Sequence, residues 1–342
     1  MFKKKILALA TASVMAFGMS ACGGSTGGSS APAGDSGSDS GSEGGQSYKV
    51  GVVQLVQHEA LDAATEGFSA ALTEALGDSV DIDVQVAAGD SATCAPIVNE
   101  FVSNGYNLIM ANATPALQSA QAATADIPIV GTSVTDYATA LSIDDWTGTT
   151  GINVTGYSDL APLDGQSEMI EELCPASDYP NAGVLYCSGE PNSKYQADQV
   201  KTYLEDKGYT VNMYTFADSN DMQSVCTTAC ADSDVLYIPT DNTAAANTEI
   251  VHNVASEAGI PVIVGEENMC KGCGLATLSI SYYDMGYEAG KMAADILENG
   301  TDPSTTEVGT VSDCVKKYNP QVAEELGFTI PDDYEALELD SE

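Results

Sequence analysis

Residues that most often carry out chemistry are scarce in this chain. Only two histidines occur in its 342 residues, His58 and His252. His58 lies in the stretch VVQLVQHE, where an apolar run gives way to polar residues. A histidine there could be a catalyst, a metal ligand, a contact to a bound molecule or a structural residue. Two histidines cannot build a multi-histidine metal site, which weakens the metal-capture and metallohydrolase hypotheses, and we predict no metal.

The common catalytic and nucleotide-binding motifs are also missing from the sequence. The stretch VGTSV (130–134) lacks the second glycine of a G-x-S-x-G nucleophile elbow. No G-x-G-x-x-G follows the first apolar run, and there is no P-loop. Glu266 and Glu267 are adjacent, so on a strand end they would point in opposite directions rather than form an acid–base pair. We therefore expect no enzyme and no cofactor.

Polar side chains follow the strand-like runs, and they are the main functional signal. Ligands of open α/β sheets bind beyond the carboxyl ends of the strands, so these positions would line a site. Thr114 and Ser193 stand where helices would begin, and such residues either cap a helix or mark N–H groups that an anionic ligand group could use. Acids such as Glu190 and Asp241 beside these starts favour a ligand that also carries a cation, as an α-amino acid does.

The hydrophobic pattern predicts the elements that would position these residues. The predicted strands are Lys49–Val56, Val80–Val86, Leu108–Ala113, Ile127–Thr132, Gly183–Tyr186, Thr210–Phe216, Val235–Pro239, Ile260–Gly265 and Leu275–Ile280. The predicted helices are one that Asp62 would cap and Gly77 would end, then Ser193–Lys207, Asn242–Ala258 and Tyr283–Leu297. Strands that alternate with helices predict parallel sheets covered on both faces.

An internal repeat in the order of elements predicts two lobes with the same plan. The stretch from Asn107, NLIMANATPALQSAQAATADIPIVGTSV, and the stretch from Asp234, DVLYIPTDNTAAANTEIVHNVASEAGIPVIVGEEN, share one order of features. Each has a strand, a polar turn, an Ala-rich helix, Ile-Pro and a second strand. The Gly- and Thr-rich segment Gly148–Leu160 indicates a crossover between the lobes, and Leu275–Ile280 indicates a second one.

The N-terminal region predicts export and a lipid anchor. Residues 1–21 begin MFKKK and continue with a 14-residue apolar run, which is typical of a signal peptide and too short for the ~20 residues of a membrane span. The cut site ends in Cys22, as in a bacterial lipobox; an ordinary signal peptide with a stray cysteine is the alternative. Residues 22–47 then predict a flexible Gly/Ser tether, with a reach of roughly 25–30 Å for its last 25 residues. We expect a lipid-anchored protein on the outer face of the cell membrane.

Charge and cysteine content narrow the partners and the compartment. The 50 acids and 11 bases give a net charge of −39, which disfavours nucleic acid as a partner. Eight cysteines remain after Cys22, and an even number in an exported protein favours disulfides. Cys270 and Cys273 are the best candidates for a local bridge. A thioredoxin-like pair, or a zinc site with Cys226 and Cys230, stays open as an alternative.

Eight stretches, in order, resemble the tryptophan/tyrosine-type branch of the solute-binding lipoproteins of ABC importers, which have a type I periplasmic-binding-protein fold. They are VVQLVQHEALDAATEGF, ANATPALQSA, VGTSVTDYATAL, NVTGYSDLAPL, LYCSGEPNSKYQ, YIPTDNTAAANT, VIVGEENM and LATLSISYYDMGYEAGKMAADIL. They span nearly all of Tyr48 to Gly327. Cys94 and the CKGC insert depart from the plainest family pattern.

The resemblance implies two Rossmann-like α/β lobes with parallel sheets, joined by a three-segment hinge that closes over one solute. Residues 48–156 and 279–302 would form lobe 1, and residues 157–278 and 303–342 would form lobe 2. The last long helix would return to lobe 1. The residues that it implies for ligand binding are Gln54, His58, Thr114, Thr135, Asp136, Ser158, Asp159, Glu190, Asn192, Ser193, Thr240, Asp241, Asn242 and Glu266.

The leading hypothesis is a binding lipoprotein that captures an aromatic or other apolar amino acid for an ABC permease and its ATPase. Helix starts near Thr114 and Ser193 would hold the carboxylate, and Asp159, Asp241 or Glu190 would hold the ammonium group. A nucleoside, a sugar or a signalling molecule on the same fold is the alternative, and an exported enzyme that uses His58 is a third. We expect a monomer.

Overall fold

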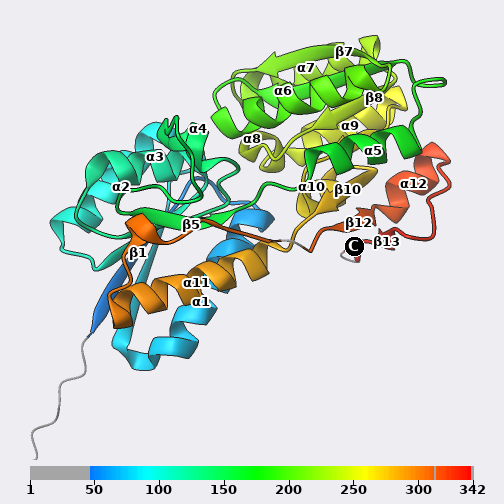
Figure 1. The fold of residues 1–342 in the computed structure, drawn as a ribbon. Coiled ribbons are helices and arrows are strands. Elements are labelled where there is room, and N and C mark those ends of the chain that lie inside the picture. The colour runs from blue at the N-terminus through cyan, green and yellow to red at the C-terminus, as the bar shows by residue number, and fades with distance from the viewer. Residues whose placement is uncertain (1–46, 312, 340–342) are drawn as a thin grey trace, which may run out of the picture. The chain divides into compact units, whose positions relative to one another are not determined.

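The structure, a computed structural model, describes residues 47–311 and 313–339 (Figure 1). The predicted signal peptide, Cys22 and almost all of the predicted tether lie outside these residues. Within the part of the chain that is described, no helix is both long enough and apolar enough to cross a membrane.

A first sheet contains six parallel strands in the order β11-β5-β4-β3-β1-β2. These strands are β1 (Tyr48–Gln54), β2 (Val80–Val86), β3 (Leu108–Asn112), β4 (Ile129–Thr132), β5 (Val154–Ser158) and β11 (Gly309–Thr310). The central strands are apolar on both faces, because helices cover both.

Two groups of helices pack on the two faces of the first sheet. They are α1 (Glu59–Leu76) and α11 (Tyr282–Asn299) on one face, and α2 (Ser91–Ser103), α3 (Thr114–Ala123) and α4 (Tyr137–Leu141) on the other. Figure 1 shows α11 beside α1, although more than 200 residues separate them in the sequence. Phe68 of α1 and Ala289 of α11 share one buried cluster with Met110 of β3. Helix α11 therefore completes the core that the N-terminal strands begin.

Two glycines let α1 and α11 approach closely. A Cβ atom on Gly67 would overlap the carbonyl oxygen of Tyr283, and one on Gly286 would overlap that of Ala64. The two helix backbones are thus in direct contact, which fixes the start of α11 against the start of α1.

A second sheet contains seven strands in the order β13-β12-β10-β9-β8-β6-β7, and only β10 and β12 run antiparallel to each other. These strands are β6 (Asn181–Cys187), β7 (Thr210–Phe216), β8 (Val235–Ile238), β9 (Val262–Val264), β10 (Ala276–Ser279), β12 (Val315–Tyr318) and β13 (Glu335–Ala336). The helices around it are α5 (Leu163–Leu173), α6 (Pro191–Asp206), α7 (Ser219–Asp232), α8 (Asn242–Ala245), α9 (Thr248–Ala258), α10 (Glu267–Gly272) and α12 (Pro320–Leu326).

The core of the second sheet has two layers. Val184 and Tyr237 pack with Leu204 of α6 on one face of the sheet. Leu236 and Val264 pack with Met222 of α7 on the other face. The prediction of two α/β units with mostly parallel sheets is therefore confirmed.

The chain passes between the sheets three times, after β5, after β10 and between β11 and β12. The third passage differs from the expected boundary at residue 303, since Gly309 and Thr310 pair with β5 of the first sheet. Three crossings of this kind are the arrangement of a type I periplasmic binding protein.

Three local predictions need correction. The segment interpreted as a crossover, Gly148–Leu160, contains a strand of the first sheet, β5. The single helix predicted over Asn242–Ala258 is two helices, because the Asn247 side chain donates to the Thr243 carbonyl (2.8 Å) where α8 ends. The first helix begins three residues before its predicted cap, Asp62, with His58 at the N-cap position.

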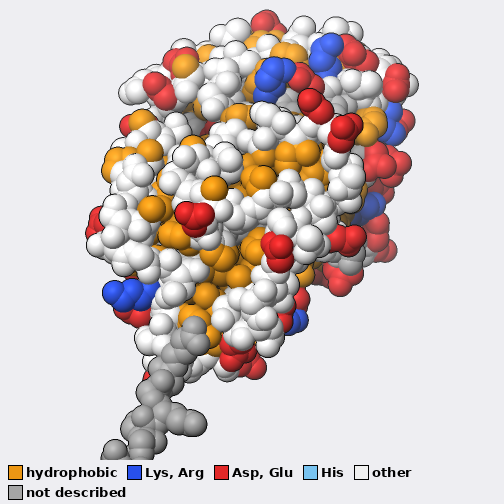
Figure 2. Space-filling view, turned by 60° about the vertical axis from the view of Figure 1, so that its left-hand side comes forward, with side chains coloured by type: hydrophobic (Ala, Val, Ile, Leu, Met, Phe, Trp, Pro, Cys, Tyr) orange, Lys and Arg blue, Asp and Glu red, His pale blue; other side chains and the backbone are white. Residues whose placement is uncertain are grey.

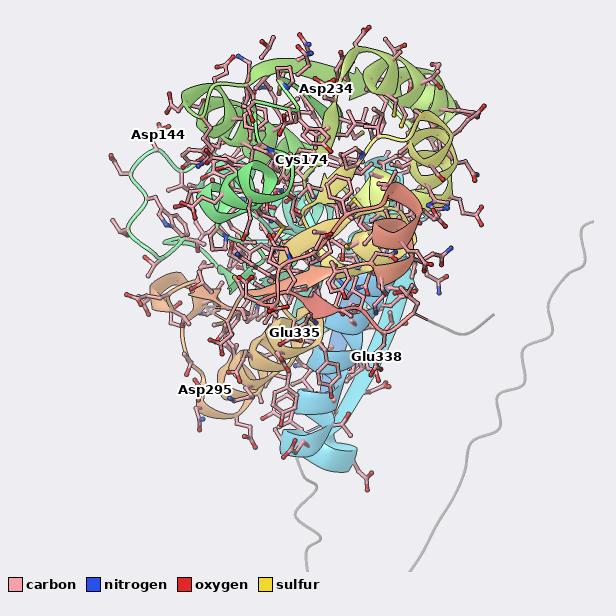
Figure 3. All side chains as sticks on the ribbon, turned by 90° about the vertical axis from the view of Figure 1, so that its right-hand side faces the viewer. Asp144, Cys174, Asp234, Asp295, Glu335 and Glu338 are labelled. Carbon is pink, nitrogen blue, oxygen red and sulfur yellow. The ribbon has the colours of Figure 1, made fainter. Side chains whose placement is uncertain are left out.

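The surface carries the acidic excess of the sequence. Figure 3 labels Asp144, Asp295, Glu335 and Glu338, which are all exposed, and Cys174, which is buried. Figure 2 shows apolar side chains reaching the surface between acidic ones on one face.

Candidate functional site

A small enclosed cavity lies beyond the carboxyl ends of strands from both sheets. Its first wall comes from the first sheet and the helices packed on it: His58, Ala60, Leu61, Ser133, Asp159 and Tyr282. Its second wall comes from the second sheet: Asn192, Thr240, Asp241, Asn242, Ala245 and Glu266. No Lys or Arg of the described residues lines the cavity, so its ionisable groups are three acids and one histidine.

The start of α1 forms one part of the first wall. His58 has an extended backbone at the N-cap position, but its side chain does not cap the helix. Among the hydrogen bonds of the described residues, none satisfies the backbone N–H of Ala60 or Leu61. These N–H groups and the positive end of the helix dipole suit an anionic ligand group.

The His58 ring spans the two walls. Its Nε2 lies 3.3 Å from Oδ1 of Asn242, whereas its buried Nδ1 has no partner in the described part of the chain. Burial lowers the pKa of His58, although the Asn242 bond and the acids Glu190 and Asp62 oppose this shift. The neutral ring is therefore favoured, and it offers one ring nitrogen to a ligand.

Asp159 follows β5 and is 5% exposed. Its Oδ2 accepts a hydrogen bond of 2.9 Å from the Tyr282 hydroxyl, at the start of α11. Its Oδ1 is buried and has no partner within the described residues. Burial raises the pKa of Asp159, and the nearby hydroxyls of Tyr282 and Thr135 only partly offset this effect. An added cationic group would stabilise the ionised carboxylate.

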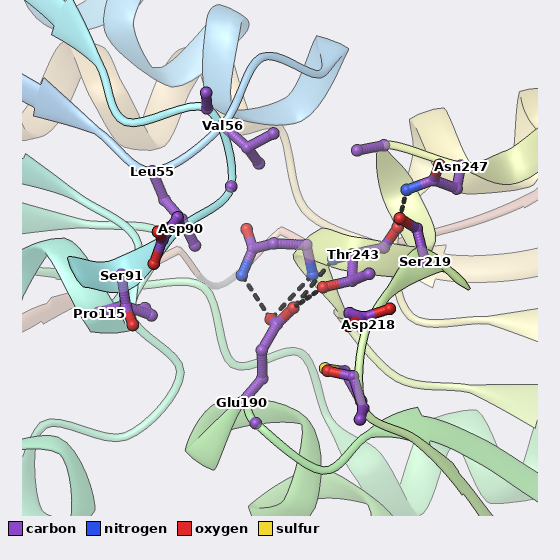
Figure 4. A pocket seen from close by; sticks show the side chains of 17 residues that line it. Leu55, Val56, Asp90, Ser91, Pro115, Glu190, Asp218, Ser219, Thr243 and Asn247 are labelled. Carbon is purple, nitrogen blue, oxygen red and sulfur yellow. Dashed lines mark hydrogen bonds between the residues drawn. The ribbon is translucent and has the colours of Figure 1, made fainter. Parts of the chain in front are cut away.

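Both oxygens of Glu190 are engaged in hydrogen bonds within the second half of the molecule, which is the second sheet with its helices. The two oxygens accept bonds of 2.7–3.2 Å from both the backbone and side chains of Asn242 and Thr243, and from Asn192. Figure 4 shows the Glu190 side chain turned towards Thr243, with its hydrogen bonds to the residues drawn there dashed. Glu190 therefore organises the start of α8 and does not line the cavity.

The acids Asp241 and Glu266 are helix caps. Asp241 accepts from the N–H groups of Cys187 (2.6 Å) and Ala244 (2.9 Å), and Glu266 accepts from those of Asn268 (2.6 Å) and Met269 (2.5 Å). Burial and the nearby Glu190 charge raise the pKa of Asp241 to about 8. Burial raises the pKa of Glu266 to about 7. Both acids touch the cavity, but each carboxylate oxygen already has a donor.

A glutamine that the sequence did not single out joins the two halves. Gln196 of α6 donates to Thr135 Oγ1 in the first half (3.2 Å) and also bonds Thr240 in the second wall. It lies one turn after the predicted residue Asn192 on the same helix, so helical spacing was the available signal. Tyr282 was also missed, because it lies just before the predicted helix Tyr283–Leu297 and its sequence position carries no sign of a distant carboxylate partner.

Seven of the fourteen predicted ligand-binding residues line the cavity: His58, Asp159, Asn192, Thr240, Asp241, Asn242 and Glu266. The other seven do not line it: Gln54, Thr114, Thr135, Asp136, Ser158, Glu190 and Ser193.

Several of the predicted residues that do not line the cavity have structural partners instead. Gln54 donates to Asp62 (2.6 Å) and accepts from Thr65 (2.7 Å), which holds β1 to α1. Asp136 caps α4 through the Thr139 N–H (2.7 Å). Ser158 donates to the Thr135 carbonyl (2.8 Å). These side chains position the wall rather than face the cavity.

The predicted bridge between Cys270 and Cys273 is absent from the structure. All eight cysteines of the described residues are free thiols. Cys270 donates to the Gly274 carbonyl (3.6 Å) and Cys273 donates to the Met269 carbonyl (3.4 Å), so the two side chains are engaged with the backbone around α10. In the part of the chain that the structure describes, no cluster of His, Cys, Asp or Glu could hold a metal ion, which leaves the zinc alternative without support.

Comparison with known proteins identifies the family. Residues 49–338 match the family described as ABC transporter substrate binding protein. The chain belongs to this family. Its members are binding proteins rather than a class of enzymes, so the implied ligand is a small molecule and the implied partners are transporter components.

Relatives within the family support the same assignment. The chain is 37% identical over 263 residues to the tyrosine-binding protein of Clostridioides difficile (strain R20291), and the match covers 75% of each chain. It is 34% identical to an ABC domain from Streptococcus pneumonia solved in complex with L-Trp, over 84% of this chain and 97% of that one, with a TM-score of 0.80.

A further relative is known without ligand. The chain is 35% identical to a substrate binding protein with adhesive properties from Clostridium difficile in its ligand-free, open form, over 86% of this chain and 100% of that one, with a TM-score of 0.65. The two solved relatives are about equally similar in sequence, but the TM-score is higher for the L-Trp complex (0.80) than for the open form (0.65). The described structure is therefore closer in conformation to the L-Trp complex than to the open form.

Proposed function

We propose that the chain is the extracytoplasmic solute-binding lipoprotein of an ABC importer and that it captures an aromatic or other apolar amino acid. The observation that carries this proposal is the cavity, which is lined both by Asp159, one of whose oxygens has no partner in the described residues, and by the start of α1 with its free N–H groups. An α-amino acid has an ammonium group for the first and a carboxylate for the second. The names of the relatives, which mention tyrosine and L-Trp, support an aromatic side chain.

The cavity as described has room for about one water molecule, so its walls would separate to admit an amino acid. The remaining lining of this space is partly apolar. Ala60, Leu61 and Ala245 line it together with the ring of Tyr282. Removing apolar ligand surface from water contributes about 25 cal/mol for each Å², so even a small apolar lining adds to affinity.

Two hydrogen bonds between the walls support a closing mechanism. Gln196 bonds Thr135, and His58 lies within bonding distance of Asn242. Both bonds join residues of the first half to residues of the second. In our proposal the ligand adds further contacts to the same two walls and so favours the closed form.

A thermal-shift screen of the purified protein against all amino acids, nucleosides and sugars tests the ligand class. Tyrosine or tryptophan at 100 times its Kd should stabilise the protein by about 2.7 kcal/mol. A shift with a sugar or a nucleoside, and none with aromatic amino acids, would overturn the amino-acid proposal. If the protein converts any ligand to a product, and if His58→Ala abolishes this turnover, the protein would instead be an enzyme.

The anchor, the partners and the oligomeric state are part of the same proposal. Cys22 would carry the lipid, and the permease and ATPase of the importer would receive the solute from a monomer. Cys22→Ala should release the protein from cell membranes into the medium, as fractionation would measure. Retention of this variant in the membrane fraction would contradict the anchor. Size-exclusion chromatography with light scattering tests the monomer.

A further inference from the structure

Five of the eight free thiols of the described residues lie in one buried cluster of the second half. They are Cys187 at the end of β6, Cys226 and Cys230 on α7, Cys270 on α10, and Cys273 directly after α10. None of them lines the cavity. These thiols take no part in the proposed binding of a solute, so their concentration in one core needs a separate explanation.

The thiols that are close in sequence are poor partners for a disulfide. Cys226 and Cys230 are four residues apart on α7, and Cys270 and Cys273 are three residues apart around α10. Cβ atoms at these helical spacings are about 5–6 Å apart, whereas a disulfide needs Cβ atoms about 3.5–4.5 Å apart. The Cys270 and Cys273 thiols also donate to different backbone carbonyls. A bridge between the two helices is therefore favoured over a bridge within either one.

Cys226 is the thiol of α7 that lies near Cys273. The bond to Cys230, burial and the charges of nearby sulfurs raise the pKa of Cys226, and Cys273 is one of those sulfurs. Burial and the charge of Glu266 raise the pKa of Cys273, and Cys230 does not contribute to that shift. Cys226 and Cys273 are 0% and 3% exposed in the same cluster. The pair that crosses from α7 to α10 is thus Cys226 with Cys273.

Cys273 is the member of this pair that a reagent in solution can reach. It lines a small pocket together with His252 of α9 and Glu325 of α12, and Glu325 is exposed. Cys226 does not line this pocket and is fully buried. A molecule that enters the pocket therefore meets Cys273 first, with Cys226 behind it in the core.

We propose that Cys226 and Cys273 form a disulfide between α7 and the end of α10 when the protein meets an external disulfide. The Cys273 sulfur attacks one sulfur of that molecule, and the first external thiol leaves with the proton of Cys273. The Cys226 sulfur then attacks Cys273 in this mixed disulfide, and the second external thiol leaves with the proton of Cys226. The two cysteines are oxidised, and the external disulfide is reduced to two thiols.

The bridge closes a long loop that carries most of the second wall of the cavity. The loop contains β8, α8, α9 and β9. Five residues that line the cavity lie within it: Thr240, Asp241, Asn242, Ala245 and Glu266. A disulfide across a long loop stabilises the folded state chiefly by restricting the unfolded chain. The modification therefore protects this wall against unfolding without a contact to the solute.

Peptide mapping after controlled oxidation tests the proposal. The full-length protein is equilibrated with oxidised glutathione, its remaining thiols are alkylated in denaturant, and the unreduced digest is analysed by mass spectrometry. The expected product is one cross-linked pair of peptides that contains Cys226 and Cys273, with the six other thiols of the described residues alkylated. The Tm of the oxidised protein should be about 5 °C higher than that of the reduced protein.

Three alanine variants test the pairing and the order of attack. Cys230→Ala is the matched control, because it removes a thiol of the same cluster one turn further along α7. It should still form the bridge and show the same rise in Tm. Cys226→Ala should stop at a mixed disulfide between Cys273 and glutathione. Cys273→Ala should form neither the bridge nor a mixed disulfide at Cys226.

The outcomes decide the proposal without reference to the solute. A cross-link between any other pair of cysteines would overturn it, and so would the absence of a cross-link in the wild-type protein after equilibration. A mixed disulfide at Cys226 in Cys273→Ala would overturn the order of attack. The wild-type peptide map decides the pairing even if a variant does not fold by circular dichroism.

Discussion

The two walls of the cavity contain similar residues but use them differently. In the first wall, buried atoms of His58, Ser133 and Asp159 have no partner within the described residues. In the second wall, only Asn192 has such an atom, and its acids are fully bonded. The comparison teaches that an acid after a strand can be either a helix cap or a ligand receptor, and that the number of donors it already binds decides which.

Helix length gives a physical reason for this difference. In the second half, α8 has only 4 residues and α10 only 6, so most of their N–H groups lack a partner within the helix and need a cap. In the first half, α1 has 18 residues and can leave its first N–H groups free. The acids of the second wall are thus engaged by backbone N–H groups, whereas the first wall keeps polar groups that have no partner in the described residues.

The largest expected effect comes from removing the acid that organises the second half. Glu190→Ala leaves the partly buried N–H groups of Asn242 and Thr243 without an acceptor. We expect a loss of about 3 kcal/mol in the free energy of unfolding, measured by urea denaturation. Glu190→Gln keeps one carbonyl oxygen and should lose less. A loss below about 0.5 kcal/mol in Glu190→Ala would contradict the structural role.

The second prediction concerns the cap Asp241 and pH. Asp241→Ala removes the acceptor of the Cys187 and Ala244 N–H groups and should cost about 2 kcal/mol of stability near neutral pH. The pKa of Asp241 is raised from 3.8 to about 8 in the folded chain, so the folded state binds this proton more tightly. Its contribution is therefore fully present below pH ~4 and is lost as pH rises towards about 8. Unfolding measured from pH 5 to pH 9 should show the deficit of Asp241→Ala shrinking as pH rises.

A pair of serines, Ser133 in the first wall and Ser193 behind the second, compares the two sides of the cavity. Ser193 donates to the Thr240 carbonyl (3.2 Å), so Ser193→Ala should lower stability by about 1 kcal/mol. Ser133 Oγ has no partner among the described residues, so Ser133→Ala should leave the stability of the ligand-free protein unchanged. Ser133→Ala should instead weaken ligand binding about 5-fold. Calorimetry and urea denaturation of both variants check this contrast, which fails if Ser133→Ala affects stability as much as Ser193→Ala.

The smallest expected effect concerns the bond that joins the two halves. Thr135→Val removes the hydroxyl that accepts from Gln196 but keeps the shape of the side chain. Because this bond exists only when the walls are together, its loss should weaken ligand binding about 3-fold with little change in unfolding. Titration calorimetry measures the affinity, and Thr139→Val, on the exposed side of α4, serves as the control. Equal affinities of the two variants would argue against a closing role.

The local pattern of the sequence determined the kind of fold. Alternating apolar runs and amphipathic stretches predicted two α/β units, and the polar residues after the strands predicted which ends would carry the site. Half of the predicted site residues line the cavity, because the rule that ligands bind at the carboxyl ends of parallel strands depends only on element order. The prediction that Asp62 caps α1 was wrong, because the Asp62 side chain accepts a hydrogen bond from Gln54 in β1 instead.

Only the tertiary structure decided which of these residues are free to bind a ligand. Glu190 is bonded to Asn242, 52 residues away, and Asp159 meets Tyr282, 123 residues away. No periodicity or spacing encodes such pairs, since they depend on how crossings between the sheets bring distant segments together. The sequence by itself thus determined that acids, amides and hydroxyls gather at the strand ends. The folded chain determined that Glu190, Asp241 and Glu266 are occupied while one oxygen of Asp159 remains available.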